Sequence, residues 1–332
     1  MSQFFVLAPT SYGGRGVFAS QSIPKDTLVH TCPAPYASVI YREFRKEVCA
    51  QCFDYSFDAR RNAWNIRLDG FYFCSDGCLD DWKRENPREL IADVVSAIDR
   101  LTKSMVKGKS KSNLSDFATP SPGPEALDTI WGKAEQYPIR GHPVVFLDEL
   151  ELEHARFVLS GLIRRHADES SNSWSDMLEL QDNELHYIRQ RPGALSSQIR
   201  VYIFIRLVVR EIPVLSQYVE TSDSVRAILS RDPGNVFGIY ETNQTGDSEM
   251  FGWCMYVSAS FFNHDCNPNI RKRRSGRAMC FYTTRDVSPA EELCTNYISL
   301  EDSVTERRQQ LSSNWYFDCG CQRCKDELSE TG

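Results

Sequence analysis

The chain has 332 residues, of which 41% are hydrophobic, 11% aromatic and 25% charged. This composition is typical of a folded globular protein and excludes a disordered or fibrous chain. Lys and Arg number 38 against 45 Asp and Glu, giving a net charge of −7 that argues against extensive phosphate-backbone binding and suits a basic partner. The longest apolar run, Val201 to Val209, is interrupted by Arg206 and is too short for a membrane span. We expect neither a membrane nor a direct nucleic-acid partner.

The first residues of the chain bear on its compartment. Residues 1–11 lack a basic segment followed by an apolar one, so the sequence predicts no secretory signal. We therefore expect a reducing compartment, nuclear or cytoplasmic. The 12 cysteines cannot be assumed to form disulfides there, and their spacing must indicate what they do.

The first third of the chain predicts short strands, then a cysteine-rich segment, then a helix. Extended segments are expected at Phe4–Leu7, Val17–Ala19 and Thr27–His30, with turns at Gly13, Gly14 and Pro24–Asp26. Residues 46–82 hold the first cysteine pairs. A helix then follows, with Asn86 as N-cap, Pro87 in the first turn and Leu90, Ile91, Val94, Val95, Ile98 and Leu101 on one face.

The remaining chain turns from helical to β-like patterns. Residues 107–125 are rich in Ser, Lys, Pro and Gly and predict an exposed loop. Helices are expected near 148–165, 176–189 and 196–210. Short strands are expected at Val236–Glu241, Trp253–Ser258, Ala278–Thr283 and Glu292–Tyr297, with turns at Asp232–Gly234 and Ser275–Gly276. A β scaffold interrupted by insertions fits this order better than regular alternation of strands and helices.

One basic run stands out in this acidic chain. It comprises Arg271, Lys272, Arg273 and Arg274, with Arg277 close by. Four adjacent cations favour a solvated loop or turn over a nucleic-acid site.

Four cysteines in two short pairs indicate a metal site. Cys49 and Cys52 form C-x2-C, and Cys74 and Cys78 form C-x3-C. Short spacings let two sulfurs of one turn point at the same ion, which a closed tetrahedral zinc site requires. The tetrad predicts one structural zinc, the alternative being unrelated thiols.

A second group of cysteines lies at the end of the chain. Cys319, Cys321 and Cys324 form C-x-C-x2-C and lack a fourth local ligand, so they either bind zinc with a distant residue or cluster by chance. Cys266, in a dense polar segment, is a candidate donor that would pin the tail onto the β core. The isolated Cys32, Cys254, Cys280 and Cys294 are most simply small core residues.

Read together, four ordered motifs resemble those of the SET-domain protein lysine methyltransferases. They are Gly14–Val17, Asn263–Asn269 with the pattern N-H-x-C-x-P-N, Glu291–Tyr297 with the pattern E-E-L-x-x-x-Y, and Cys319–Cys324. The cysteine pairs placed after the first β segment are similar to the SMYD branch, in which a MYND zinc finger splits the SET domain. The resemblance covers nearly the whole chain.

The resemblance implies an α+β fold: a β-rich SET domain with a pseudoknot, an inserted single-zinc MYND-like finger, a helical insertion and a zinc-binding post-SET tail. The segment beginning at Asn263 would pass through a loop formed near Tyr297. The expected parts are residues 1–45 and 216–300 for the SET core, 46–82 for the finger, 83–215 for the linking helix, loop and helical insertion, and 301–332 for the tail.

The sequence departs from the family pattern in two ways. A full MYND finger interleaves two zinc sites, whereas no Cys or His lies between Cys52 and Cys74 and no His follows soon after Cys78. The chain also ends at Gly332 without the helical carboxy-terminal domain of larger SMYD enzymes. It resembles a shorter form of the kind found in fungi.

The resemblance also implies S-adenosylmethionine as cofactor and two structural Zn²⁺ ions. Residues matching the cofactor-binding positions are Gly14, Arg15, Gly16, Asn235, Ser260, Asn263, His264, Tyr297 and Phe317. Tyr297 matches the active-site tyrosine, and Trp315 and Phe317 match walls of the lysine channel, although such aromatics would otherwise be simple core residues. The expected zinc ligands are Cys49, Cys52, Cys74 and Cys78 in the finger and Cys266, Cys319, Cys321 and Cys324 in the tail.

We therefore expect a protein lysine N-methyltransferase that acts as a monomer on an accessible lysine of a histone or non-histone protein. The chemistry needs a neutral amine, which an apolar channel and a neighbouring sulfonium both favour. One alternative is a catalytically weak SET and zinc-finger adaptor in a chromatin or transcription complex. A DNA-binding regulator is disfavoured by the acidic composition.

Overall fold

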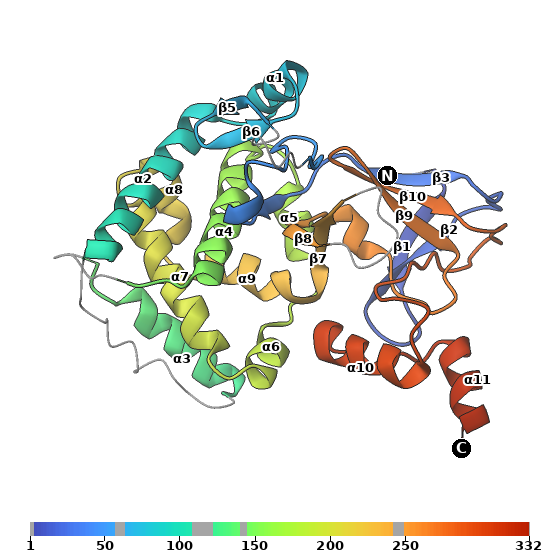
Figure 1. Cartoon of the computed structure of the whole chain (residues 1–332). Helices are drawn as coiled ribbons and strands as arrows, with labels where there is room; N and C mark the ends of the chain where they lie inside the picture. Colours follow the sequence, from blue (N-terminus) through green and yellow to red (C-terminus); the bar gives the residue numbers. More distant parts are fainter. Residues whose placement is uncertain (1–2, 57–63, 108–121, 140–144, 242–248, 332) are drawn as a thin grey trace. The chain divides into compact units, whose positions relative to one another are not determined.

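The computed structural model describes residues 3–56, 64–107, 122–139, 145–241 and 249–331. It divides into two compact units, each assembled from segments that are far apart in the sequence (Figure 1). The first unit comprises Met1–Pro35, Pro233–Asn235 and Tyr256–Gly332, and the second comprises Tyr36–Asp232 and Val236–Met255.

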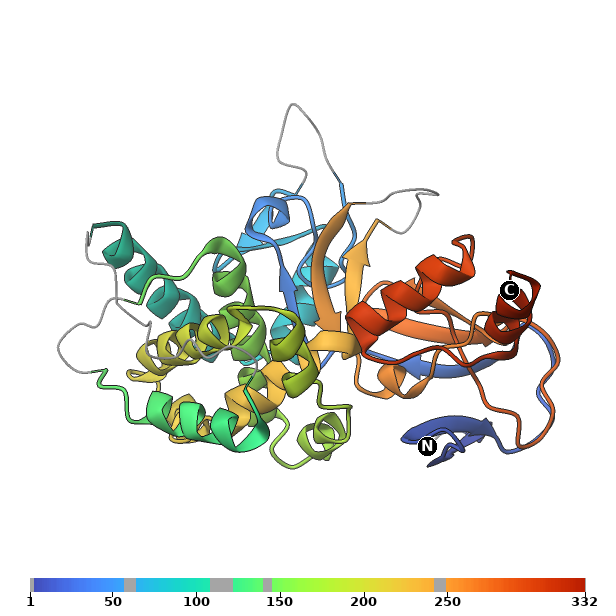
Figure 2. The ribbon, with the colours of Figure 1, turned by 90° about the horizontal axis from the view of Figure 1, so that it is seen from below.

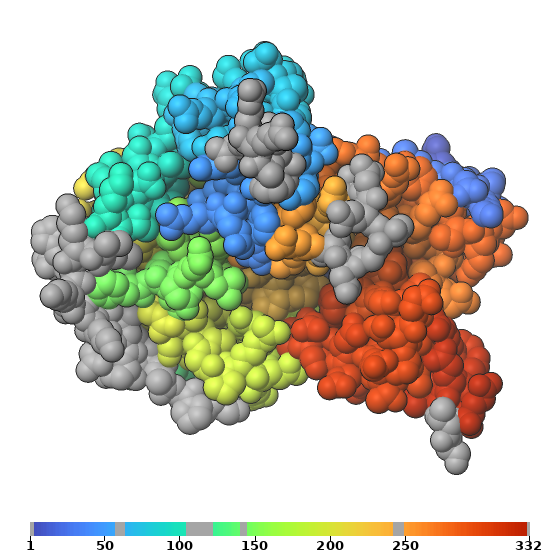
Figure 3. Space-filling model, in the orientation of Figure 1, coloured from blue at the N-terminus to red at the C-terminus, as the bar shows by residue number. Residues whose placement is uncertain are grey.

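The first unit is built from small antiparallel sheets. Strands β1 (Phe5–Pro9) and β2 (Arg15–Ala19) form a hairpin, and β3 (Leu28–Cys32), β10 (Ala278–Thr283) and β9 (Ile270–Ser275) form a sheet in the order β3-β10-β9. A short 3₁₀ turn, η4 (Ser258–Phe261), precedes the polar segment that begins at Asn263. Helices α10 (Val304–Trp315) and α11 (Gln322–Thr331) complete the unit as two separate rods (Figure 2). In the space-filling view their atoms form one continuous mass (Figure 3).

Two segments that are distant in sequence lie hydrogen-bonded to each other in this unit. His264 and Thr295 form an isolated parallel bridge. The Thr295 amide donates to the Asn263 carbonyl at 2.8 Å, and the Asp265 amide donates to the Thr295 carbonyl at 3.0 Å. Leu293, two residues before Thr295, donates its amide to the Val17 carbonyl of β2 at 2.7 Å. The loop around residues 291–297 therefore bonds to both the glycine-rich hairpin and the Asn263 segment and holds them together.

The second unit combines a three-stranded sheet with helices. Its strands are β4 (Ala37–Ile40), β8 (Met250–Met255) and β7 (Val236–Tyr240), in the order β4-β8-β7, and a hairpin of β5 (Ile66–Leu68) and β6 (Phe71–Phe73). Its helices and helical turns are η1 (Arg42–Phe44), α1 (Asp76–Glu85), α2 (Arg88–Lys107), α3 (Pro124–Glu135), α4 (Glu149–Ala167), α5 (Ser173–Leu178), α6 (Glu184–Gln190), α7 (Ala194–Val209), α8 (Pro213–Ser216), η3 (Gln217–Val219) and α9 (Asp223–Asn235).

The helical core is organised around α7, which packs against α2, α3 and α4 (Figure 1). Val201 to Ile205 are all buried, and a helix that is apolar on every side belongs in a core. Arg206, which interrupts the apolar run, donates to the carbonyls of Ala134 and Tyr137 at 3.0 and 2.9 Å and so satisfies the carboxyl end of α3. Helix α4 begins with a full capping box formed by Asp148 and Glu151.

Many of the predicted elements are confirmed. The strands near residues 4–7, 17–19, 27–30, 236–241 and 278–283 are present as β1, β2, β3, β7 and β10, and the helices near 148–165 and 196–210 are present as α4 and α7. A helix does follow the finger, and Cys32, Cys254, Cys280 and Cys294 are buried as expected. The predicted strand Trp253–Ser258 is shifted, because β8 ends at Met255 and Ser258 begins η4. Most of the predicted loop 107–125 lies outside the described residues.

Other predictions are wrong for identifiable reasons. Asn86 caps the end of α1 rather than the start of α2, because its side-chain amide donates to the Trp82 carbonyl at 2.8 Å. The predicted helix 176–189 is two helices, α5 and α6, since the Asp182 carboxylate accepts the Glu184 amide at 3.0 Å and starts a new turn. The segment Glu292–Tyr297 forms isolated bridges and no strand.

The prediction of a loop or turn for the basic run is also wrong. The run forms the edge strand β9 rather than a loop, because Arg271, Lys272, Arg273 and Arg274 pair in register with residues 279–282 of β10. Exposure alternates along the strand, so Arg271 and Arg273 are exposed while Lys272 and Arg274 are partly buried. Helices α1, α3, α8, α9, α10 and α11 were not predicted. Within the described residues, no helix is long and apolar enough to cross a membrane.

Glycine at position 252 is required by the pairing of β4 with β8. Gly252 lies opposite Ile40, and a Cβ there would overlap the Val39 carbonyl oxygen and the Ile40 Cα. We expect Gly252→Ala to lower the free energy of unfolding by about 3 kcal/mol, because backbone atoms cannot yield as a flexible side chain can. Thermal or denaturant unfolding measures this. The matched control is Gly132→Ala in α3, where a Cβ meets nothing within 4 Å and alanine should stabilise the helix by about 1 kcal/mol. Equal stability of the two variants would contradict the role of Gly252.

Candidate functional site

The site is built on the turn between β1 and β2. Gly14 has a φ of 72°, a left-handed conformation that glycine adopts without strain, and its carbonyl accepts the Thr10 amide at 3.1 Å. No atom lies within 4 Å of where a Gly14 Cβ would stand. At Gly16 the reverse holds, since a Cβ would overlap the Glu292 carboxylate. The turn thus leaves the backbone exposed at Gly14, whereas at Gly16 the lack of a side chain lets the Glu292 carboxylate lie close to the backbone.

A polar network ties this turn to the Asn263 segment. The Asn263 side-chain amide donates to the Arg15 carbonyl at 2.7 Å, to Glu292 Oε1 at 2.9 Å and to the Tyr12 hydroxyl at 3.2 Å. The Tyr12 hydroxyl itself donates to Glu292 Oε1 at 2.6 Å. Desolvation and the Glu292 carboxylate together raise the pKa of Tyr12, so its hydroxyl keeps its proton. Sequence reasoning missed Tyr12 and gave Glu292 no role.

Arg15, Ser260 and Asn235 lie around the same segment. The Arg15 guanidinium stacks 4.2 Å from the centre of the Phe261 ring. The Ser260 hydroxyl donates to the Asn235 carbonyl at 3.0 Å, which joins these two predicted residues through the Asn235 backbone. The Asn235 side chain is buried.

His264 connects the tyrosine to a cysteine. The Tyr297 backbone amide donates to His264 Nδ1 at 3.0 Å, so the proton of the neutral ring is on Nε2, which lies 3.2 Å from Cys266 Sγ and donates to it. Burial lowers the pKa of His264 to about 4, and the charges of Lys272 and Arg307 add to the effect. The imidazole is therefore neutral at physiological pH, and each ring nitrogen has one partner.

Tyr297 lies in an aromatic cluster with its hydroxyl on a backbone carbonyl. The hydroxyl donates to the Phe262 carbonyl at 2.8 Å, and the ring centre lies 5.6 Å from that of Trp315 and 6.5 Å from that of Phe317. The Phe317 and His264 ring centres are 6.3 Å apart. Burial raises the pKa of Tyr297, and the neighbouring Cys294 and Glu292 act in the same direction, so the phenol stays protonated and keeps its hydrogen bond to the Phe262 carbonyl. The tail aromatics thus do reach the tyrosine.

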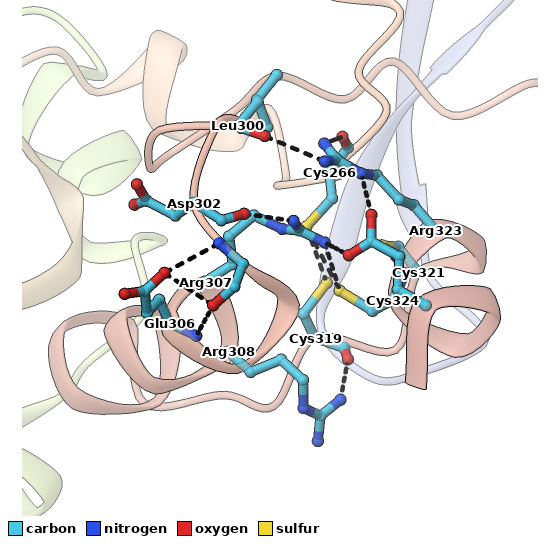
Figure 4. A network of polar contacts seen from close by, with 12 residues as sticks. Cys266, Leu300, Asp302, Glu306, Arg307, Arg308, Cys319, Cys321, Arg323 and Cys324 are labelled. Carbon is cyan, nitrogen blue, oxygen red and sulfur yellow. Dashed lines mark hydrogen bonds and ion pairs between the residues drawn. The ribbon is translucent and has the colours of Figure 1, made fainter. Parts of the chain in front are cut away.

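The tail cysteines converge on Cys266 beside this cluster (Figure 4). The four sulfurs of Cys266, Cys319, Cys321 and Cys324 all lie within 4.8 Å of one another, with Cys266 at 3.9 Å from Cys319 and 3.5 Å from Cys324. Zn–S bonds of about 2.3 Å in a tetrahedron give sulfur separations of about 3.8 Å. The four sulfurs therefore fit a Zn²⁺ ion, and the chance-cluster alternative is not supported.

Two arginines surround the tail cluster (Figure 4). Arg307 is fully buried, places its guanidinium 3.9 Å from Cys324 Sγ and pairs with Glu327 at 2.6 Å. Arg323 donates to the Cys266 carbonyl at 3.1 Å and also pairs with Glu327. Four thiolates on one Zn²⁺ carry a net charge of −2, so the two guanidinium groups offset charge that would otherwise be buried. Sequence reasoning missed both arginines.

The finger holds the second cysteine cluster, in the other unit. Cys49, Cys52, Cys74 and Cys78 have their sulfurs within 4.8 Å of one another, with Cys74 at 3.6 Å from Cys52 and 3.4 Å from Cys78. Ser75 accepts the Cys78 amide at 3.1 Å as the N-cap of α1, which places Cys78 in the first turn of the helix. Among the described residues these are the two groups that could hold a metal ion.

Comparison with known proteins shows the family of the chain. A model of the SET domain matches residues 14–298, so the chain belongs to the SET-domain family. The chain is 29% identical to a potential protein lysine methyltransferase, SET6, of Saccharomyces cerevisiae, over 99% of this chain and 96% of that protein.

Shorter stretches match other SET proteins. A SET and MYND domain-containing protein of Dictyostelium discoideum is 31% identical over 32% of this chain and 26% of its own length. The histone-lysine N-methyltransferase SET5 of Yarrowia lipolytica is 40% identical over 23% of this chain and 18% of its own length. The combination of a SET domain with a cysteine finger is therefore shared with relatives.

The two clusters predict two bound zinc ions per chain, because each provides a complete set of four thiolates. Cys266→Ser and Cys52→Ser should each reduce the zinc content from two equivalents to one. Only Cys266→Ser should also weaken binding of S-adenosylmethionine, because Cys266 contacts His264 while Cys52 lies in the finger. Metal analysis and calorimetry measure the two effects. One zinc or none in the unmodified chain would contradict the assignment, as would equal losses of cofactor binding in both variants.

Proposed function

We propose that the chain is an S-adenosylmethionine-dependent protein lysine N-methyltransferase. The observation that carries the proposal is the placement of the Tyr297 hydroxyl on the Phe262 carbonyl, inside an aromatic cluster that His264 joins to the tail cysteines. Membership of the SET-domain family and the names of the relatives support the same reaction. The first unit thus holds the tyrosine, the aromatic residues around it and the β1–β2 turn that we assign to the cofactor.

The residues around the β1–β2 turn fit the cofactor. S-adenosylmethionine would supply a methyl group on a positively charged sulfur. Gly14 leaves the backbone of the turn accessible, while Asn263, through its side-chain amide, fixes the Arg15 carbonyl and the Glu292 carboxylate. The Glu292 carboxylate, which accepts from Asn263 and Tyr12, brings a negative charge to this turn that suits a cationic ligand. We assign Gly14, Arg15, Gly16, Asn235, Ser260, Asn263, His264, Tyr297 and Phe317 to cofactor binding.

The acceptor lysine would lie beside Tyr297. Trp315 and Phe317 provide aromatic surface next to the tyrosine ring, which disfavours a charged ammonium and favours the neutral amine. Because the Tyr297 hydroxyl donates its proton to the Phe262 carbonyl, its oxygen would orient the amine by accepting a hydrogen bond from the amine N–H. No zinc ion takes part in the transfer, since both cysteine clusters use all four ligand positions on sulfur.

The substrate, the cellular setting and the roles of the two clusters follow from the same reasoning. The substrate is a protein with an accessible lysine, histone or non-histone, and the relatives named as histone-lysine methyltransferases favour a nuclear or cytoplasmic setting. The post-SET zinc holds Trp315 and Phe317 at Tyr297, whereas the finger braces the fold or binds a partner. The pseudoknot crossing, the five domain ranges and the monomeric state are part of this proposal.

The test of the proposal is Tyr297→Phe. This change removes one oxygen with little loss of volume, so folding and zinc content should survive, at a cost of about 1 kcal/mol for the hydrogen bond to Phe262. Methyl transfer should fall by about 10²-fold, because the hydroxyl no longer positions the amine. Single-turnover transfer from labelled S-adenosylmethionine to core histones or a cell extract measures the rate.

The matched control is Tyr282→Phe on β10, whose ring faces the exposed Arg271 and which should transfer methyl groups at the unmodified rate. Unchanged transfer by Tyr297→Phe would remove Tyr297 from the mechanism. Tight cofactor binding by the unmodified chain, without transfer to any protein acceptor, would favour the adaptor instead.

A further inference from the structure

Lys272 lies at the tyrosine, although its strand is otherwise a solvated basic ribbon. On β9 it pairs in register with Phe281, which is fully buried and stacks on Phe262 at 4.3 Å between ring centres. The Lys272 side chain points inward, and its ammonium donates to the Asn296 carbonyl. Its Nζ lies 6.0 Å from the centre of the Tyr297 ring. Because side chains alternate between the two faces of β9, the Lys272 side chain lies in the candidate site.

This ammonium has no anionic partner. No described carboxylate lies within 4.0 Å of Lys272 Nζ, whereas Arg271 on the same strand pairs with Asp26 at 3.0 Å. Burial lowers the pKa of Lys272 to about 8. A cation that is largely withdrawn from solvent and has no counter-ion destabilises the fold, so its presence beside a candidate active site calls for a functional reason.

The titratable groups near Lys272 do not supply the missing negative charge. His264, on the Asn263 segment, is neutral, and Tyr297 keeps its proton. Besides burial, Glu292 and Cys294 both raise the pKa of Tyr297. The hydrogen bonds that Glu292 accepts come from Tyr12 and Asn263 and not from Lys272. From β10 the neighbour of Lys272 in register is the apolar Phe281. The charge of Lys272 is therefore not offset by its surroundings.

We propose that Lys272 adds a positive charge beside Tyr297, in addition to that of the cofactor sulfonium, and thereby keeps the substrate's acceptor lysine in its neutral, reactive form. The inference rests on the proposed methyltransferase function. Two amines close together in a poorly solvated site cannot both be charged easily, so one of them loses its proton. Lys272 retains its proton because the Asn296 carbonyl accepts a hydrogen bond from it, while the acceptor amine faces aromatic rings and releases its proton to solvent.

The experiment compares pH–rate profiles of the unmodified chain and Lys272→Met. The probes are core histones and poly-L-lysine, with labelled S-adenosylmethionine under single-turnover conditions from about pH 6.5 to 10. Removing the neighbouring charge raises the pKa of the acceptor amine, so the rising limb of the profile should move to higher pH by about one unit. The variant should be about tenfold slower at pH 7, and the two rates should converge at high pH, where both acceptors are neutral.

Two further variants make the result specific. Arg273→Met removes the same charge from the exposed face of β9 and should leave the profile in place. Lys272→Arg keeps the charge and should leave the rising limb at or below its original pH, which keeps the proposal testable if Lys272→Met folds poorly. Zinc content and cofactor affinity, measured in parallel, confirm that each variant is folded.

Each outcome decides the matter. Superimposable profiles for Lys272→Met and the unmodified chain would overturn the role of Lys272 and leave the methyltransferase assignment standing. An equal fall in rate at every pH would show a purely structural role and also overturn it. Absence of transfer by the unmodified chain to both acceptors would contradict the proposed function and, with it, this inference.

Discussion

The candidate site depends on the two hydrogen bonds that the His264 ring makes. One ring nitrogen accepts the Tyr297 amide and the other donates to Cys266 Sγ, while the backbone at 263–265 bonds to Thr295 on both sides. A neutral imidazole can satisfy these two partners in one tautomer only. A protonated ring could not accept from Tyr297, so burial and the neighbouring cations, which keep His264 neutral, also preserve the position of the tyrosine. The ring thus links a metal-type cysteine cluster to the residue assigned to the chemistry.

The tail makes that link rigid. Its three cysteines surround Cys266, and Arg323 binds the Cys266 carbonyl, so α11 is held to the Asn263 segment by both sulfur and backbone. The same tail delivers Trp315 and Phe317 to the ring of Tyr297. Loss of zinc would therefore loosen the aromatic wall and His264 together. This coupling would make a zinc ion that takes no part in the chemistry necessary for the proposed methyl transfer.

The sequence was sufficient for the parts of the site that are encoded in short motifs. Cysteine spacing predicted both clusters, and N-H-x-C-x-P-N with its downstream tyrosine predicted that Asn263, His264 and Tyr297 would be functional. Asn263 bonds to Thr295 and His264 bonds to Tyr297, so the two motifs do meet. The predicted bounds of individual helices were wrong where side chains compete with the backbone for hydrogen bonds. Asp182 divided one predicted helix, and Asn86 capped the preceding helix instead of the next.

Residues that act through tertiary contacts left little local signal. Arg307 resembles any polar residue of an exposed helix, yet it is buried against Cys324 and Glu327. Lys272 was hidden within a run of four cations, because composition does not show which of them a strand will turn inward. Tyr12 and Glu292 meet Asn263 only after the hairpin and the 291–297 loop pack together. Strand register was the missing information for Lys272, whereas for Tyr12 and Glu292 it was the packing of a turn against a loop.

The most direct measurement is amide hydrogen exchange at Tyr297, whose N–H donates to His264 Nδ1 at 3.0 Å. If zinc at the tail cluster holds His264 in place, this amide should exchange slowly in the metal-loaded chain. Removing zinc with a chelator should then accelerate its exchange by at least about tenfold, while amides of β10 remain protected by their pairing with β3 and β9. Equal protection of the Tyr297 amide with and without zinc would contradict the account.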